Sequence, residues 1–256
     1  MIIVADIGNT NIVLGAYKGP ELLNSWRMAT RINRTADETG VFICSVLEKS
    51  GYAPEDVENC IISSVVPDIT YSLTHAFQKY FNIDPMVVHY KMKMDIRLGS
   101  QENPREVGAD RIVNCQAAYK LYGGPIIVID YGTATTYDVV DAEGNFLTGI
   151  TAPGIKICAE ALFDRTALLN KVELAMPPSM LVENTTESIQ AGIVFGRIGE
   201  TEYIVARLKK ELGIPNAKVA GTGGLARIIS QGTDIFNVIN PNLTLEGLRW
   251  LYEMNK

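Results

Sequence analysis

The sequence lacks the residue patterns of a zinc-binding, secreted or membrane-spanning protein. It has only two histidines, and its four cysteines are scattered without a CxxC pair, so no zinc site is expected. The cysteines read as small apolar residues of a reducing compartment: Cys44, Cys60, Cys115 and Cys158. No apolar run approaches the length of a membrane span, and the short apolar start MIIVADI has no basic leader. We therefore predict a cytoplasmic protein without membrane contact.

The sequence also has fewer basic than acidic residues. Lys and Arg number 23 against 29 Asp and Glu, which gives a formal net charge of −6. A nucleic-acid partner would need a basic face, so none is expected. The sequence also contains no GxxxxGK[ST] loop and no GxGxxG between a strand and a helix, which disfavours the two commonest nucleotide-binding folds. Phosphate can still be held by backbone N–H groups and a bound cation.

Short apolar runs alternate with longer helical patterns along the 256 residues, and this alternation predicts an α/β fold. Strands are expected at 2–5, 12–17, 60–66, 86–88, 125–129, 136–140, 145–151 and around 219. Helices are expected at 35–49, 68–81, 112–121, 156–169, 185–212, 224–231 and 244–254. Residues 91–111 are polar and irregular, which is typical of a functional loop.

The two halves of the chain begin alike, with IIVADIGNTNIVLGAY from Ile2 and IIVIDYGTATTYDVVD from Ile126. An ungapped alignment pairs Asp6 with Asp130, Gly8 with Gly132 and Thr10 with Ala134. Self-similarity at this distance predicts a duplicated unit, which we divide into residues 1–117 and 118–256.

An Asp at the end of a buried strand is costly unless a metal or hydrogen-bond donors compensate its charge. The Gly two residues later allows a close approach of the backbone, and the residues around it supply N–H and hydroxyl donors for phosphate. The alternative is an Asx-turn in a simple hairpin, which a single copy would not distinguish. Two matched copies favour the ligand-binding interpretation.

Two further motifs lie where a loop meets a helix. Residues 221–224 read GTGG after a short strand, a setting in which a nucleotide can reach a helix N-terminus. Residues 108–111 read GADR and place a carboxylate beside a guanidinium. Asp110 could accept a proton from a substrate hydroxyl and Arg111 could hold a substrate carboxylate. Alternatively, Asp110 only complements the helix dipole and Arg111 is a surface residue.

Taken together, the motifs resemble type III pantothenate kinase, a family of the acetate and sugar kinase, Hsp70 and actin superfamily. They occur in one order over nearly the whole chain: DIGNTN at 6–11, NPREVGADR at 103–111, DYGTATT at 130–136, APGI at 152–155, NTTESIQAG at 184–192 and GTGG at 221–224. The resemblance implies a duplicated ribonuclease-H-like fold, as in actin-like ATPases, with ATP in a central cleft. It implies phosphorylation of pantothenate to 4′-phosphopantothenate, the first step of coenzyme A biosynthesis, by a homodimer.

The resemblance also implies roles for individual residues. Asp110 would be the general base. ATP and its phosphates would be bound by Asp6, Gly8, Asn9, Thr10, Asn11, Gly132, Thr133, Gly221 and Gly223. Pantothenate would be contacted by Gly108, Ala109, Arg111, Gln101 and, from the neighbouring subunit, Thr185. Asp6 would act through Mg²⁺ or another divalent cation, bound directly or through water, and Asp130 would bind a monovalent cation, K⁺ or NH4⁺.

One position departs from the family pattern, because Gln101 stands where many members carry Tyr, and this affects the wall of the pantothenate pocket. Two other functions fit the same fold: a sugar or carboxylate kinase, and a non-catalytic regulatory protein. The presence of Asp6, Asp110 and Asp130 argues against the non-catalytic protein, which would have no need for three acidic side chains that are costly to bury. A purely structural protein is hard to reconcile with the duplicated turns.

Overall fold

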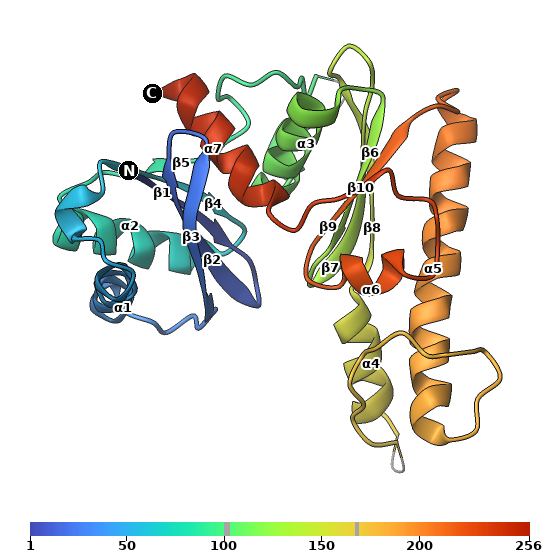
Figure 1. The fold of residues 1–256 in the computed structure, drawn as a ribbon. Coiled ribbons are helices and arrows are strands. Elements are labelled where there is room, and N and C mark those ends of the chain that lie inside the picture. Colours follow the sequence, from blue (N-terminus) through green and yellow to red (C-terminus); the bar gives the residue numbers. More distant parts are fainter. Residues whose placement is uncertain (100–102, 167–168) are drawn as a thin grey trace. The chain divides into compact units, whose positions relative to one another are not determined.

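The computed structural model describes residues 1–99, 103–166 and 169–256. It divides into two compact α/β units (Figure 1). The first comprises Met1–Asp95, Glu102–Ala117 and Leu243–Lys256, and the second comprises Ile96–Gln101 and Ala118–Asn242. Each unit contains one five-stranded sheet.

The sheet of the first unit has the strand order β3-β2-β1-β4-β5. Its strands are β1 (Ile2–Ile7), β2 (Asn11–Lys18), β3 (Glu21–Ala29), β4 (Asn59–Ser64) and β5 (Met86–Val87). β1, β2 and β3 pair antiparallel, whereas β4 and β5 run parallel to β1. The helices are α1 (Ala36–Lys49), α2 (Pro67–Phe81), the first part of α3 (Ala109–Tyr122) and α7 (Leu243–Asn255), with 3-10 turns at Pro54–Asp56 and Pro104–Glu106. Strand β3 was not predicted from the sequence.

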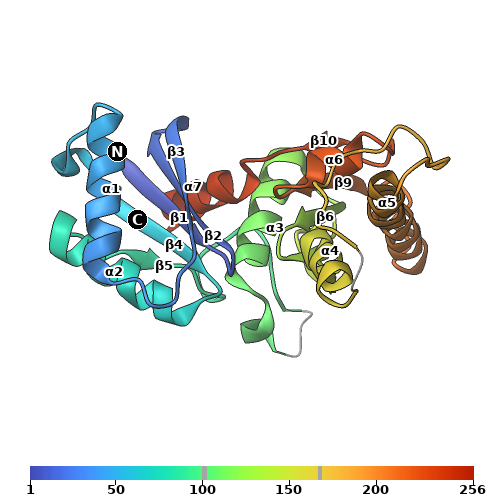
Figure 2. The same cartoon turned by 90° about the horizontal axis from the view of Figure 1, so that it is seen from below.

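Alternate residues of β1 pack into two different cores. Ile3, Ala5 and Ile7 belong to the cluster that includes the apolar faces of α1 and α2. Ile2 and Val4 belong to the cluster that includes α7. Successive strand side chains point to opposite faces, so helices must cover both sides of the sheet, as Figure 2 shows. This explains why the β1 sequence is an unbroken apolar run.

Helix α7 is part of the first unit, although the sequence division grouped 243–256 with the second half. The reason is its apolar face: Leu245, Leu248 and Leu251 are buried in the cluster with β1. Helix α1 buries Ile43 and Leu47, whereas Val41 on the same helix is 58% exposed.

The sheet of the second unit has the order β10-β9-β6-β7-β8. Its strands are β6 (Ile126–Tyr131), β7 (Ala134–Val140), β8 (Phe146–Pro153), β9 (Lys218–Thr222) and β10 (Val238–Ile239). Its helices are α4 (Ile155–Asp164), α5 (Thr185–Glu211) and α6 (Ala226–Ser230). β6, β7 and β8 pair antiparallel, whereas β9 and β10 run parallel to β6. The topology of the first sheet is therefore repeated, and the predicted duplicated α/β fold is confirmed.

The two opening hairpins differ by one residue. In the first, Ile7 pairs with Ile12, which leaves residues 8–11 in the turn. In the second, Tyr131 pairs with Thr135, which leaves residues 132–134. The ungapped alignment of Thr10 with Ala134 is therefore wrong beyond the glycine, because the second strand is shifted by one position.

Helix α5 is 27 residues long, but charged and polar residues recur throughout it. Among the described residues, no helix combines the length and the apolar character that a membrane crossing requires.

Candidate functional site

Two aspartates occupy equivalent places at the ends of the two central strands. Asp6 is half-buried near the end of β1, and its parallel register partner on β4 is the fully buried Ser63. Asp130 is half-buried near the end of β6, and its parallel register partner on β9 is Thr222, which is 2% exposed. Each carboxylate thus lies beside a buried hydroxyl residue, an arrangement that the two sequence motifs alone did not indicate.

The first turn carries two exposed polar side chains. The Gly8 N–H donates to the Asn11 carbonyl at 3.0 Å, while the side chains of Asn9 and Thr10 are exposed. Thr30, which follows the unpredicted strand β3, holds this turn from one side. Its hydroxyl donates to the Gly8 carbonyl at 2.6 Å, and its N–H donates to the Thr10 carbonyl at 3.0 Å.

The second turn is tighter. The Gly132 N–H donates to the Ala134 carbonyl at 3.1 Å, and both Gly132 and Thr133 are exposed. Thr135, which follows in the motif, is fully buried, so its hydroxyl does not share the exposed face of the turn. Helix α4 begins directly behind this turn. A Cβ on Gly154, its N-cap residue, would lie 2.0 Å from the Thr133 carbonyl oxygen, so only glycine permits this approach.

The GTGG segment brings one glycine against Asp130. Gly223 has φ +90°, and a Cβ there would lie 2.5 Å from Asp130 Oδ1. Gly221 serves a different purpose, because it is buried in β9 and a Cβ there would collide with the side chains of Ile239 and Phe236. The helix that follows, α6, is only five residues long, much shorter than the expected 224–231.

The carboxylates do not form a metal cage. Within residues 1–99, 103–166 and 169–256, no group of three or more His, Cys, Asp or Glu side chains could hold a metal ion. Asp6 and Asp130 each stand at their own strand end. Mg²⁺ is commonly bound by one or two carboxylates together with water and substrate phosphates. The residues therefore fit a cation that is shared with a phosphate ligand.

Asp110 lies in the first turn of α3 and is half-buried. Burial disfavours its charged form and raises the pKa of the carboxyl group above its usual range. The backbone N–H of Arg111, which donates to Asp110 Oδ1 at 2.8 Å, and the Arg111 charge act in the opposite direction. A carboxylate with a raised pKa is a better proton acceptor than an ordinary aspartate.

A pocket of about 330 Å³ lies in the first unit beside Gly108 and Ala109, the residues that precede Asp110. Its wall also includes Val88, Tyr90, Arg105 and Ile112. The Arg105 Nε donates to the Tyr90 hydroxyl at 3.0 Å, and the guanidinium carbon lies 5.7 Å from the centre of that ring. Sequence reasoning missed Tyr90 and Arg105, because nothing in their spacing shows that they meet.

Two further residues were predicted to contact the substrate. One of them, Gln101, lies outside the described residues. Thr185 is the first residue of α5 and is exposed, and the preceding Asn184 caps the helix by accepting a hydrogen bond from the Glu187 N–H at 2.9 Å.

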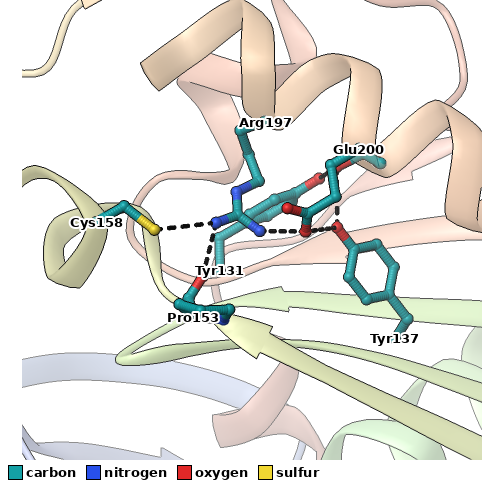
Figure 3. A network of polar contacts seen from close by, with 7 residues as sticks. Tyr131, Tyr137, Pro153, Cys158, Arg197 and Glu200 are labelled. Carbon is teal, nitrogen blue, oxygen red and sulfur yellow. Dashed lines mark hydrogen bonds and ion pairs between the residues drawn. The ribbon is translucent and has the colours of Figure 1, made fainter. Parts of the chain in front are cut away.

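A buried polar network joins α5 to the second sheet (Figure 3). Arg197, which is 6% exposed, donates to the Pro153 carbonyl at 2.6 Å and forms an ion pair with Glu200. The hydroxyls of Tyr131 and Tyr137 lie 2.9 and 3.2 Å from the hydroxyl of Thr201. Burial raises the pKa of both tyrosines, so they remain protonated donors at neutral pH. This network was also not predicted.

The two repeated α/β units, each with an Asp-x-Gly turn after its first strand, define a duplicated α/β fold. Solved structures agree on the fold. A protein proposed to be a 2-dehydro-3-deoxygalactonokinase from Sinorhizobium meliloti has a TM-score of 0.64 at 13% identity, covering 99% of this chain and 96% of its own. The activator of the 2-hydroxyisocaproyl-CoA dehydratase from Clostridium difficile, with bound ADPNP, has a TM-score of 0.59 at 15% identity, covering 98% and 93%.

Residues 2–207 match the type III pantothenate kinase family. A curated type III pantothenate kinase from Agathobacter rectalis is 48% identical over 252 residues, which is 98% of this chain and 96% of the relative. The chain therefore belongs to the type III pantothenate kinase family, as its motifs indicated. It is a nucleotide-binding kinase, and the non-catalytic alternative is set aside.

Proposed function

We propose that this protein transfers the γ-phosphoryl group of ATP to the 4′-hydroxyl of pantothenate, the first step of coenzyme A biosynthesis. The observation that carries the proposal is the 48% identity to a type III pantothenate kinase over 98% of the chain. Asp6, Asp110 and Asp130, the three acids expected for the reaction, are all present.

Asp110 acts as the general base in this proposal. It accepts the proton of the 4′-hydroxyl as the hydroxyl oxygen attacks the γ-phosphorus and ADP leaves. The raised pKa of Asp110 and its place next to the pocket at Gly108 and Ala109 support this role. General-base assistance of this kind contributes about a hundredfold to ten-thousandfold to a rate.

The two turns bind the phosphates of ATP. Asn9, Thr10 and Thr133 are exposed polar residues of these turns, and Gly223 allows the backbone to lie close to Asp130. Phosphoryl transfer depends mainly on positioning and on neutralising charge. A divalent cation held by Asp6 and by the ATP phosphates would supply part of that neutralisation, and Asp130 would bind K⁺ or NH4⁺.

The pocket beside Gly108 receives pantothenate. Its volume of about 330 Å³ lies within the range of small-molecule sites. Pantothenate carries a carboxylate, and Arg105 at the pocket wall offers a guanidinium for it in addition to Arg111. Tyr90 and Arg105 thereby form part of the wall of the pantothenate pocket.

Pantothenate turnover is tested by substrate profiling. Purified protein is given ATP, Mg²⁺ and pantothenate, or a sugar or short carboxylic acid in its place, and ADP release is measured. The proposal expects turnover with pantothenate only. Turnover with a sugar and none with pantothenate would move the assignment to a different acceptor.

The cation proposal has its own test. Pantothenate-dependent turnover is measured with and without K⁺ for the wild type and for Asp130→Asn. We expect K⁺ to stimulate the wild type and to have no effect on the variant. Equal stimulation of both proteins would place any K⁺ site away from Asp130.

We further propose that the protein is a cytoplasmic homodimer in which the exposed Thr185 reaches the substrate of the neighbouring subunit. Sedimentation at micromolar concentration checks the assembly, and a monomer would contradict it. If Thr185 serves its neighbour, a mixture of Asp110→Asn and Thr185→Val subunits recovers activity that neither variant has alone.

A further inference from the structure

We propose that Arg197 is a positioning residue for the second phosphate-binding turn: it holds the junction between β8 and α4 against Gly132 and Thr133 and so sets the affinity for nucleotide. The inference rests on the proposed role of this turn in binding ATP phosphates. Arg197 itself touches neither the turn nor, in this proposal, the nucleotide.

The first step is that Arg197 is unusually placed for a helix arginine. Its side chain is 5% exposed, in the middle of the 27-residue helix α5. A buried guanidinium is costly unless its charge and its N–H donors are satisfied. Here one arm pairs with Glu200 and the other donates to the Pro153 carbonyl, with Cys158 Sγ at 3.6 Å (Figure 3). Because burying the guanidinium costs free energy, we looked for its role in the residues that it contacts.

The second step is what those contacts join. Pro153 is the last residue of β8, and Cys158 lies in the first turns of α4. Arg197, which belongs to α5, therefore connects this helix to the end of β8 and to the start of α4. The guanidinium is planar, and its donors form a rigid fork, so it fixes the direction of the Pro153 carbonyl as well as its distance.

The third step connects that junction to the turn. Pro153 is the register partner of Ala134, the residue that closes the turn. The next residue, Gly154, is so close to the turn that a Cβ would lie 2.0 Å from the Thr133 carbonyl oxygen and 2.7 Å from that of Gly132. Because the two backbone segments leave no room even for a Cβ between them, a shift of one segment displaces the other. The position of Pro153 therefore sets the position of the turn.

A second arm of the same network reaches the strand that carries Asp130. Tyr131 follows Asp130 directly, and its hydroxyl lies 2.9 Å from that of Thr201, four residues after Arg197 on α5. Tyr137 bridges the two arms, since its hydroxyl donates to Glu200 at 3.3 Å and lies 3.2 Å from the Thr201 hydroxyl. Through the hydroxyls of Tyr131 and Tyr137, helix α5 thus contacts the strands on both sides of the Gly132–Thr133 turn.

The test compares Arg197→Met and Arg197→Lys with Arg207→Met. Arg207 is the matched control, because it lies on the same helix in an exposed ion pair with Glu211. Met keeps the apolar stem of Arg197 and removes every donor. Lys keeps the charge but cannot reach Glu200 and Pro153 with a fixed fork. ADP affinity is measured by calorimetry, KM is measured for ATP and for pantothenate, and thermal unfolding reports folding.

We expect Arg197→Met to weaken ADP binding and raise the KM for ATP on the order of tenfold, as loss of a supporting contact typically does. The KM for pantothenate stays unchanged, Arg197→Lys falls between Met and wild type, and Arg207→Met matches wild type. Unchanged ADP affinity in a folded Arg197→Met protein would overturn the proposal, as would equal rises in both KM values.

If Arg197→Met does not fold, Arg197→Lys carries the same test: weaker ADP binding than in the wild type is expected, and an unchanged ADP affinity would overturn the proposal. ADP binding requires no acceptor, so this measurement stands even if the protein proves to phosphorylate something other than pantothenate. The failure of the positioning role and the failure of the proposed substrate are therefore distinguishable.

Discussion

Gly223 lies directly against the carboxylate of Asp130. With φ +90°, a Cβ at position 223 would lie 2.5 Å from Asp130 Oδ1 and 2.7 Å from the backbone of Tyr131. The glycine is therefore required both by its left-handed backbone and by the space that Asp130 occupies. This contact ties the GTGG segment to the second acid-ended strand, two motifs that are about ninety residues apart in the sequence.

The contact predicts that alanine substitutions at two neighbouring glycines have very different effects on stability and on ATP binding. Gly223→Ala should lower the free energy of unfolding by more than about 1 kcal/mol and weaken ATP binding, because the new methyl group meets backbone and carboxylate. Gly224→Ala is the control, since Gly224 is exposed and a Cβ there meets nothing within 4 Å. Urea unfolding and ADP calorimetry measure both effects. Equal behaviour of the two variants would contradict this account of Gly223.

Asp110→Asn should separate activity from stability. We expect kcat/KM to fall by about a hundredfold to ten-thousandfold. The protein should not become less stable. The pKa of Asp110 is raised by burial, so the native state holds its proton more tightly than the unfolded state. The stability this provides at low pH is lost as the pH rises from the unfolded pKa through the raised native pKa, and the loss is complete at higher pH. At neutral pH, Asn removes this loss, so thermal unfolding should occur at the same temperature or higher.

The same group should govern the acid side of the pH profile. In the wild type, kcat/KM should fall as the pH drops through the raised pKa of Asp110, a midpoint above that of an ordinary aspartate. The residual activity of Asp110→Asn should lack this limb. Near-normal turnover of a folded Asp110→Asn protein would remove Asp110 as the base.

We expect Thr30 to affect nucleotide binding, although it belongs to none of the sequence motifs. Thr30→Val removes the hydroxyl that donates to the Gly8 carbonyl at 2.6 Å, one of the two hydrogen bonds by which Thr30 holds the first turn. We expect the KM for ATP to rise about tenfold because the donors of the turn lose their alignment. Thr30→Ser keeps the hydroxyl and should largely restore the wild-type value. If Ser and Val behave alike, the hydrogen bond is not the cause.

We expect Arg105 to contribute to the binding of pantothenate and not to the binding of ATP. Arg105→Met removes the guanidinium from the pocket wall, and we expect the KM for pantothenate to rise about tenfold, the loss typical of one hydrogen bond to a charged group. Tyr90→Phe removes the partner that holds Arg105 at 3.0 Å and should produce a smaller rise. A change in the KM for ATP alone would place Arg105 outside the acceptor pocket.

Much of the fold could be predicted because its strands are buried on both faces. Ile2–Ile7 and Ile126–Tyr131 read as apolar runs that end in the same Asp-x-Gly turn, so both central strands and their duplication are visible in the sequence. Strand β3 was missed because it is an edge strand with one buried residue, Met28, and no clear alternation. The assignment of α7 depends on tertiary packing, which periodicity does not specify.

The acids and glycines of the candidate site could also be predicted, since turn chemistry is local. The residues that support them could not. Thr30, Tyr90 and Arg105 reach their partners only after the chain has folded. In the sequence Arg197 looks like a solvated charge in a polar helix, and only the folded structure shows that it is buried against Pro153. The ungapped alignment also concealed that the second turn is one residue shorter.

The central claim is tested most directly by ADP release from purified protein supplied with ATP and Mg²⁺, with and without pantothenate. The account predicts release that requires pantothenate and that yields one 4′-phosphopantothenate for each ADP. Folded protein that binds ADP but releases none in the presence of pantothenate would contradict it.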